Sequence, residues 1–452
     1  MTRRTALTPP RLLVLLAVGV LAIMGVLAGS GSGPIHSAIG VAPTASAMAS
    51  ATASDGLGLS AAPSPTLSPI PTDRLQATLD RLVRKLGIPG ASVTILWPDG
   101  RSWTGTSGLA DVAARRPVTA QTEFAVASMS KTFLAALILR LVEEGRLTLD
   151  EPVAPLLPGV RVGSTVTVRM LLDHTSGLAD FFFGKGIDKA LLATRGATWT
   201  AARVLRYVGK PYFPPGTGWH YSNTNYLLLG IIAQRVGGAP VATQLRTRFF
   251  EPLGLTGAYV QLVDPTLLPV AHGYTFDRPG VAARPRDVSD GTSIMPFTSV
   301  VSAAGAAGDV AATSMDLAGW ARALYGGQVL QHKTLADAIR DVRLTTPFHP
   351  YVPYGLGIQV TRIGGRLAYG HTGQVLGFRG ELRYLPAIGV AIAIETNQNR
   401  TGTGSIVAAL LNIASPATPP ASPSPTASPS PSPGLSASPS SSVPGLPAAS
   451  TP

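Results

Sequence analysis

The order of strand and helix patterns along residues 73–414 constrains the fold of this chain more than any other feature. Residues 91–111 indicate two strands joined at Pro98-Asp99-Gly100, and four further strand patterns follow between residues 354 and 397. The region between these groups shows mainly helical spacing, and further helices are predicted at 72–87 and 405–414. Strands at both ends of a helical middle predict an α+β fold, in which an antiparallel β-sheet is flanked by helices and carries a mostly helical subdomain.

Low-complexity segments precede and follow this region. Residues 1–28 combine a basic start with an uncharged apolar run at 12–28, which is typical of an export signal. Two interpretations stay open, a cleaved signal peptide and an uncleaved membrane anchor. Residues 29–72 are predicted to be a flexible linker, and the Pro/Ser-rich residues 415–452 a disordered tail. We therefore expect an exported protein, extracellular or in the cell envelope.

Composition excludes several classes of function. The formal net charge is +12, but the arginines are scattered singly or in pairs with no basic run, so nucleic acid is not an expected partner. The absence of cysteine excludes disulfides, thiolate zinc sites and a cysteine nucleophile. His, Asp and Glu show no metal-ligand spacing, and no Gly-rich phosphate loop is present, so we expect neither a metal nor a cofactor.

Ser128 and Lys131 stand three residues apart at the start of a predicted helix that runs to Glu144. This spacing places a hydroxyl and an amine on one helix face, at the end where the helix dipole favours negative charge. The apolar residues that follow would desolvate the amine and lower its pKa from about 10.4 toward neutrality, so that it could take the serine proton. The alternative is a capping serine beside a solvated lysine.

Tyr221 and Asn223 lie in a Pro/Gly-rich loop before a predicted buried helix at 225–236. A phenol near an ammonium could ionise more easily and relay a proton, and the amide could hold a substrate carbonyl. The alternative is an aromatic core residue beside an asparagine turn.

The segment from His371 to Gln374 lies where a predicted strand ends. Gly373 could let a substrate backbone approach closely, and Thr372 could hold a substrate carboxylate. The backbone N–H of Gln374, paired with that of Ser128, could form an oxyanion hole. The alternative is an ordinary strand end with a turn glycine.

Taken in order, the Ser-x-x-Lys, Tyr-x-Asn and His-x-Gly motifs resemble those of the serine β-lactamase and penicillin-binding protein superfamily. The branch that looks nearest contains class C β-lactamases and D-Ala-D-Ala carboxypeptidases, because class A enzymes carry Ser-Asp-Asn and Lys-Thr-Gly instead. Stretches such as VRMLLDHTSGL and AAGDVAATSMDLAGWARAL extend the similarity over residues 73–414.

The resemblance implies a role for each motif. Ser128 would be the nucleophile, and Lys131 and Tyr221 would share the general acid–base work. Substrate contacts would come from Asn223 and from His371, Thr372, Gly373 and Gln374. A neutral imidazole at His371 would attract a substrate carboxylate less than the lysine of the more familiar motif.

Four further residues are interpreted beside these motifs. Arg379 could restore the missing positive charge, although a solvated strand residue is the favoured interpretation. His174 is expected to be a structural hydrogen-bonding residue in a turn, and Asp173 and Asp180 are expected to be cap and turn residues.

The implied function is that of an exported serine hydrolase acting through an acyl-enzyme, with a D-alanyl-D-alanine carboxypeptidase-like peptidoglycan hydrolase favoured. Its partner would be a peptidoglycan stem peptide or a small ester, amide or β-lactam. The chain would act as a monomer and touch a membrane only through an N-terminal anchor. A β-lactamase and an esterase or amidase on the same scaffold stay open. A non-catalytic penicillin-binding sensor is disfavoured, because every motif residue is present.

Overall fold

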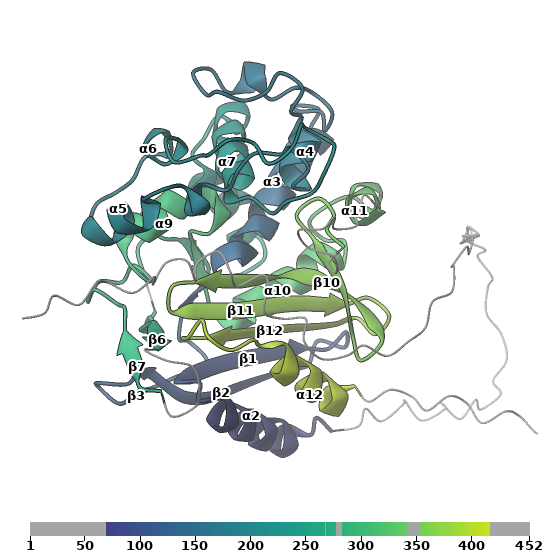
Figure 1. Cartoon of the computed structure of the whole chain (residues 1–452). Helices are drawn as coiled ribbons and strands as arrows, with labels where there is room; N and C mark the ends of the chain where they lie inside the picture. The colour runs from purple at the N-terminus through teal and green to yellow at the C-terminus, as the bar shows by residue number, and fades with distance from the viewer. Residues whose placement is uncertain (1–68, 267, 277–282, 341–352, 416–452) are drawn as a thin grey trace, which may run out of the picture. The chain divides into compact units, whose positions relative to one another are not determined.

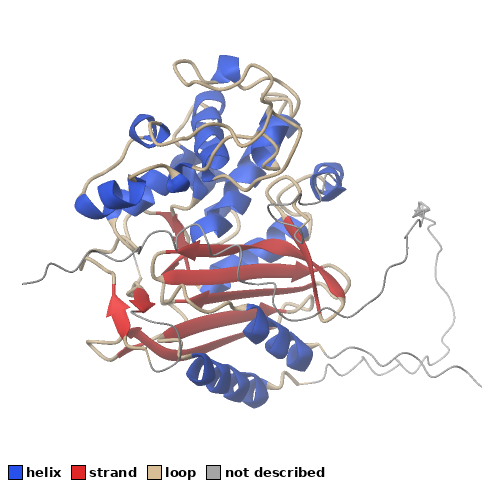
Figure 2. Cartoon of the chain, viewed as in Figure 1, coloured by secondary structure: helices blue, strands red, loops and turns tan. Residues whose placement is uncertain are grey.

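A seven-stranded antiparallel sheet is the main element of the computed structural model, which describes residues 69–266, 268–276, 283–340 and 353–415. Its strand order is β3-β2-β1-β12-β11-β10-β9 (Figures 1 and 2). The strands are β1 (Gly90–Leu96), β2 (Ser102–Asp111), β3 (Arg116–Pro117), β9 (Gln359–Ile363), β10 (Arg366–Val375), β11 (Phe378–Leu385) and β12 (Val390–Thr396). Because β1 pairs with β12, the first and the last strands of the described chain lie side by side in the middle of the sheet. The predicted α+β class is confirmed.

One face of this sheet is covered by the first and last described helices, α2 (Thr72–Leu86) and α12 (Gly404–Ala414), which pack against each other (Figure 1). In α2 the buried residues Leu75, Leu79 and Val83 recur every four positions, so one side of the helix meets the sheet. The helix ends at Gly87, whose φ of 63° is left-handed. Both helices lie where the sequence predicts them.

The other face carries α10 (Ser314–Tyr325) and leads to the helical part of the molecule. That part contains α3 (Ser130–Glu143), α4 (Val168–Leu172), α5 (Ile187–Ala193), α6 (Ala201–Leu205), α7 (Asn223–Gly237), α8 (Val241–Leu245), α9 (Thr298–Ala304) and α11 (His332–Arg340). Short strands β4 (Phe124–Ala125), β8 (Val310–Ala312) and β5 (Tyr259–Val260) form a second sheet, and β6 (Tyr274–Phe276) pairs with β7 (Pro285–Asp287).

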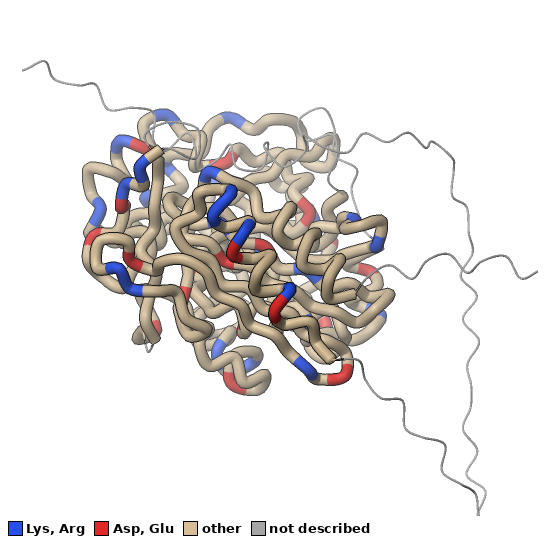
Figure 3. Tube along the Cα trace, turned by 90° about the horizontal axis from the view of Figure 1, so that it is seen from below, with Lys and Arg blue, Asp and Glu red and all other residues tan. Residues whose placement is uncertain are grey.

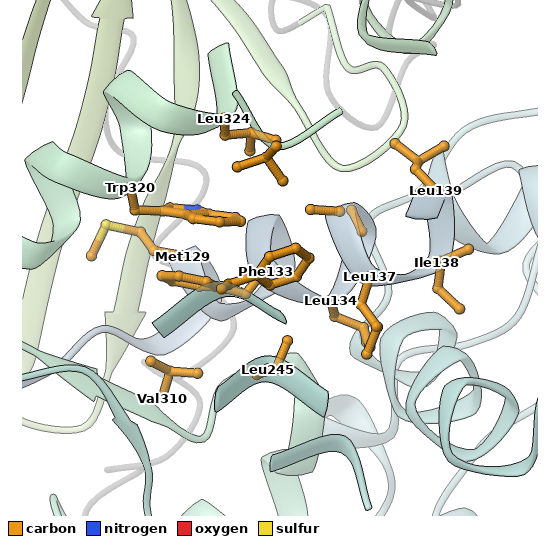
Figure 4. Close-up of a cluster of buried hydrophobic side chains, with 14 of the residues drawn as sticks. Met129, Phe133, Leu134, Leu137, Ile138, Leu139, Leu245, Val310, Trp320 and Leu324 are labelled. Carbon is orange, nitrogen blue, oxygen red and sulfur yellow. The ribbon is translucent and has the colours of Figure 1, made fainter. Parts of the chain in front are cut away.

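The helix α3 runs through the largest apolar cluster and is buried along most of its length. Its Phe133 stacks on Trp320 of α10 with ring centroids 4.1 Å apart, and Met129 lies beside the same indole (Figure 4). This packing holds the start of α3, with Lys131 and the preceding turn that contains Ser128, against the sheet. Such aromatic contacts add roughly 0.5–1.5 kcal/mol beyond the burial of their area.

Figure 3 shows the lysines and arginines spread over several elements, with acidic residues between them. No helix among the described residues is both long and apolar enough to cross a membrane. The predicted signal or anchor at 1–28 lies outside the described residues, as do the linker at 29–72 and the tail at 415–452 apart from their innermost residues.

Glu395 of β12 is a buried acid in the face of the sheet covered by α10, between Ser92 of β1 and Gly380 of β11. Its side chain has no exposure, and neither carboxyl oxygen has a hydrogen-bond partner among the described residues. Burial raises the pKa of this carboxyl well above its ordinary value, so the folded protein holds this proton to a higher pH than the unfolded chain does.

Replacing Glu395 with glutamine is therefore expected to stabilise the protein increasingly as the pH rises above 4.5, the ordinary pKa of the group. The unfolded wild-type chain releases the proton above that pH and the folded chain does not. Each further pH unit then lowers the free energy of unfolding of the wild-type protein by about 1.4 kcal/mol, until the pH reaches the pKa of Glu395 in the folded state. Thermal unfolding from pH 4 to 8 measures the effect. Glu251→Gln, at an exposed site, is the control, and a constant difference from wild type at every pH would contradict the prediction.

Candidate active site

Ser128 lies in a 3-10 turn, Ala127–Met129, between β4 and α3. The α-helix begins at Ser130, two residues later than the sequence predicts. Ala127 has a φ of 49°, a left-handed conformation that is uncommon for any residue other than glycine and concentrates at functional sites. Ser130 accepts a hydrogen bond from the Val310 N–H at 3.1 Å and ties the turn to β8. Ser128 is partly exposed while its neighbours are buried, so the turn presents its hydroxyl.

Lys131 is fully buried behind Ser128, and its protonated amine donates three hydrogen bonds. Its Nζ lies 3.2 Å from Ser128 Oγ, 2.8 Å from Asn223 Oδ1 and 2.7 Å from the Ala307 carbonyl oxygen. Burial lowers the pKa of this amine to about 7, although Asp180 and Asp309 act in the opposite direction. The expected desolvated lysine is thus present, and a large fraction of it is neutral near pH 7.

Asp180 orients the amide that faces Lys131. Asn223, the first residue of α7, donates from Nδ2 to Asp180 Oδ2 at 2.7 Å, which directs its Oδ1 toward the lysine. Asp180 also caps a short turn by accepting from the Phe182 N–H at 3.0 Å. It is therefore the expected cap, but it also belongs to the site, which the sequence does not reveal. Asp180 lies in a loop 43 residues from Asn223, and no local pattern joins the two.

Tyr221 lies over Lys131 with its ring, 5.1 Å from the amine to the ring centroid. Its buried hydroxyl lies near Ser128 but outside hydrogen-bond geometry. The expectation that the ammonium eases ionisation of this phenol is wrong, because burial raises the pKa of Tyr221 well above its ordinary value. A protonated Tyr221 can relay a proton but cannot serve as a phenolate base.

His174 holds the backbone between Tyr221 and Asn223. Its Nδ1 accepts from the Ser222 N–H at 3.2 Å and from Asn225 Nδ2 at 3.1 Å, and its ring lies 4.4 Å from that of Tyr221. This is the structural hydrogen-bonding role expected from the sequence. Asp173, beside it, accepts from the Thr175 N–H and hydroxyl, as a turn residue does.

His371 is buried on β10 with both ring nitrogens hydrogen-bonded. Its Nδ1 must donate to the Thr372 carbonyl oxygen at 2.6 Å, so its Nε2 accepts from the Tyr354 hydroxyl at 2.9 Å. Burial lowers the pKa of this imidazole to about 3, and the nearby Lys131 adds to the shift. The ring is therefore neutral, as the sequence interpretation assumes.

Thr372 and Gln374 alternate with His371 along β10, so their side chains leave the strand on its other face. There Gln359 donates to Thr372 Oγ1 at 3.2 Å and accepts from the Thr372 N–H at 3.1 Å. Val375 and Phe378 close the hairpin as a hydrogen-bonded pair, which makes Gln374 and Arg379 a non-hydrogen-bonded pair. The Gln374 N–H therefore points away from β11, toward the edge of β10 that β9 does not cover. An oxyanion role for this N–H stays a prediction.

Gly373 meets the turn of Ser128 rather than open space. A Cβ at this position would lie 2.2 Å from the carbonyl oxygen of Val126 and 3.2 Å from Met129 Cε. The close approach expected for a substrate backbone is thus taken by the protein's own chain. Gly373 sets the distance between β10 and the Ser128 turn.

Arg379 does not fit the favoured interpretation of a solvated strand residue, because it is only 3% exposed. It alternates with Gly380, whose missing Cβ would face Met129, so Arg379 points to the opposite side of the sheet. It is therefore not placed to replace a cation beside Ser128. In the described ranges no group of three or more His, Asp or Glu residues could hold a metal.

The folded region is similar to known proteins over much or nearly all of its length. The family model described as Beta-lactamase matches residues 75–414. Penicillin-binding protein 4 from Amycolatopsis lactamdurans is 31% identical over 337 residues, covering 71% of this chain and 84% of that protein. Penicillin-binding protein 4* from Bacillus subtilis (strain 168) is 30% identical over 256 residues, and this chain spans 55% of its length and is itself covered to 55%. A solved D-stereospecific amidohydrolase from Streptomyces sp. superposes with a TM-score of 0.65 at 29% identity, covering 77% of this chain and 99% of that one.

Proposed function

This chain belongs to the beta-lactamase family of serine hydrolases, and on that premise we propose that it cleaves amide bonds next to D-amino acids through an acyl-enzyme on Ser128. The proposed substrate is a peptidoglycan stem peptide, which makes the activity that of a D-alanyl-D-alanine carboxypeptidase. The observation that carries the proposal is the buried Lys131 amine, 3.2 Å from Ser128 Oγ and with a pKa lowered to about 7. The names of two similar proteins, a penicillin-binding protein and a D-stereospecific amidohydrolase, support the choice of substrate.

The proposed reaction has two stages. Neutral Lys131 takes the proton of Ser128 as Oγ bonds to the substrate carbonyl carbon, and the N–H groups of Ser128 and Gln374 stabilise the oxyanion. The C–N bond then breaks, and Tyr221 relays the proton from protonated Lys131 to the leaving nitrogen. Water adds to the carbonyl carbon of the resulting ester and gives a proton to neutral Lys131. The C–O bond to Ser128 then breaks, the proton returns to Ser128 Oγ, and the acid product leaves.

A second candidate is an amidase or esterase for substrates that lack a terminal carboxylate. The neutral His371 favours it, because an imidazole held in this state offers no charge to a carboxylate. A β-lactamase would use the same residues and differ in the speed of the second stage.

The acylation rate is expected to rise about tenfold per pH unit below pH 7 and to level off above it, because only neutral Lys131 can accept the serine proton. Protonated Tyr221 predicts no additional rise at higher pH from formation of its phenolate. Stopped-flow acylation by a chromogenic cephalosporin from pH 5 to 9 measures the profile. His220→Asn is the control, because His220 is half-buried beside Tyr221 and its imidazole is a second titratable group there, with a pKa that burial lowers below its ordinary value. If His220→Asn no longer shows the rise in acylation rate with pH, the rise belongs to His220 and not to Lys131.

Intact-mass measurement after incubation with benzylpenicillin tests the proposed nucleophile, with Ser128→Ala as the matched variant. A lasting adduct on wild type alone supports a penicillin-binding peptidase, and consumption of the drug without an adduct supports a β-lactamase. If neither an adduct nor consumption of the drug is observed, both the peptidase and the β-lactamase are rejected. The assignment then moves to an esterase or a sensor.

Three substrates then separate the candidates: a peptide ending in D-Ala-D-Ala, the same peptide with an amidated end, and a p-nitrophenyl ester. The carboxypeptidase proposal requires the free-acid peptide to be cleaved with the highest kcat/KM. Preference for the amidated peptide would establish the amidase, and turnover of the ester alone would establish the esterase.

Access to peptidoglycan requires export, which we include in the proposal. It is supported by the apolar run at 12–28 with its basic flank. The mass of the protein recovered from the cell envelope and from the medium distinguishes an uncleaved anchor from a cleaved signal peptide.

A further inference from the structure

A groove of about 790 Å³ lies on the helical part of the molecule, and none of the residues in the proposed catalytic roles lines it. Its walls come from α7, the start of α8, the end of β5 and the segment before β8, and they are mainly apolar: Leu227, Ile231, Val241, Val260, Val263 and Ala306. Val263 is 62% exposed, so the groove opens to solvent. This volume falls in the range of roughly 300–1,000 Å³ that is typical of small-molecule sites.

Asp309 is the acid that lines this groove. Its backbone carbonyl accepts from the Gln261 N–H, but no hydrogen bond or ion pair from another described residue reaches its carboxyl group. Burial raises the pKa of that carboxyl to about 7, and the neighbouring Asp264 adds to the shift. The Lys131 amine acts on this carboxyl and lowers its pKa, but that amine is hydrogen-bonded to Asn223 and Ala307 and not to Asp309. A carboxylate among apolar walls with no cation in direct contact would therefore be stabilised by a cationic ligand in the groove.

We propose that this groove binds an apolar molecule carrying one cationic amine, and that the ammonium pairs with Asp309. The apolar walls would cover the body of the ligand, and the acid would fix its orientation. This site is separate from the proposed catalytic centre and does not depend on the reaction at Ser128.

Charge complementarity selects an amine over an anion. Arg235, the other charged lining residue, is exposed on α7 and stays hydrated, so an anion would gain little from it. Asp309 lies in a less polar environment, where pairing with a cation is stronger than in water. A neutral ligand would bury the same area but leave Asp309 unpaired.

Calorimetric titration of the full chain at pH 8 with 4-phenylbutylamine tests the proposal, with 4-phenylbutan-1-ol and 4-phenylbutyrate as matched probes. At this pH Asp309 is largely ionised and the amine is protonated. The amine is expected to bind wild type at least about tenfold more tightly than the alcohol, and the butyrate more weakly than either. Asp309→Asn should remove the preference for the amine.

Asp188→Asn is the matched control, because Asp188 is a partly buried acid on α5 outside the groove. It should keep the preference, as should Ser128→Ala. Ile231→Trp, which fills the groove and retains Asp309, should abolish binding of both amine and alcohol. Melting curves confirm that the variants are folded. Absence of amine binding, or amine binding unchanged in Asp309→Asn and Ile231→Trp, would overturn the proposal.

Binding has a second expected consequence, which rests on the proposed function. Asp309 raises the pKa of Lys131, and it lies two residues from Ala307, whose carbonyl oxygen accepts from that amine. An ammonium paired with Asp309 would cancel its charge, so saturating phenylbutylamine should move the rise in acylation rate to lower pH. A bound amine that leaves the profile in place would contradict this coupling and leave the groove site standing. A profile without any rise would instead contradict the role of Lys131.

Discussion

Replacing Lys131 with methionine is expected to lower the acylation rate by about 10²–10⁴-fold, the range that a general base contributes. Methionine fills much of the same space but cannot take the proton of Ser128, which lies 3.2 Å from the amine. The time course of the penicilloyl adduct, followed by intact mass, measures the loss. Raising the pH should not rescue the variant, because no amine remains to lose its proton.

The same substitution leaves Asn223 Oδ1 and the Ala307 carbonyl oxygen without their donor. Each unpaired buried group costs about 1–3 kcal/mol, so thermal unfolding must show that the variant is folded before the rates are compared. Lys189→Met, at an exposed position on α5, is the control for loss of one lysine. A folded Lys131→Met protein that acylates within tenfold of wild type would remove Lys131 from the role of base.

Replacing Gly373 with alanine is expected to lower the acylation rate by about a hundredfold, although this residue supplies no reacting group. The new Cβ would lie 2.2 Å from the Val126 carbonyl oxygen, so the Ser128 turn and β10 must move apart. A displacement of about 1 Å between reacting groups can cost on the order of a hundredfold in rate. Stopped-flow acylation, with circular dichroism as a check on folding, measures it.

Gly196→Ala is the matched control, because no atom lies within 4 Å of the Cβ it would add. The pH profile of the acylation rate distinguishes a displaced Ser128 turn from a change in the pKa of Lys131. Gly373→Ala should lower the acylation rate at the plateau and leave the pH of the rise near 7. Full activity in Gly373→Ala would mean that the distance between turn and strand does not control the reaction.

The fold could be predicted from the sequence because its signals are local. Alternation in residues 91–111 and 366–397 indicated the strands of the sheet, and four-residue spacing in 72–87 indicated α2. The helix α3 begins two residues later than the sequence predicts. Ala127 adopts a left-handed φ of 49°, and alanine gives no sequence signal for that conformation.

The residues of the candidate site likewise fall into two groups, those whose contacts follow from local spacing and those that only tertiary contacts bring together. Ser128 and Lys131 share one turn, so their spacing predicted their contact, which the hydrogen bond between them confirms. Asp180 reaches Asn223 across 43 residues, and the partner of Gly373 is a backbone carbonyl oxygen 247 residues earlier, at Val126. Arg379 is buried by packing across the sheet, which no single strand pattern reports. These relations depend on tertiary contacts, and the sequence alone could not supply them.

Because α2 and α12 pack side by side, the two ends of the described region lie on the same side of the sheet, which matters for attaching this hydrolase to a support or fusion partner. The described chain begins and ends on the back of the sheet, opposite the face against which the Ser128 turn packs (Figure 1). A surface, bead or fusion partner joined directly to residue 69 or residue 415 would therefore meet the side of the sheet that α2 and α12 cover. Immobilisation through either of these two residues would leave the turn that carries Ser128 on the side of the sheet away from the support.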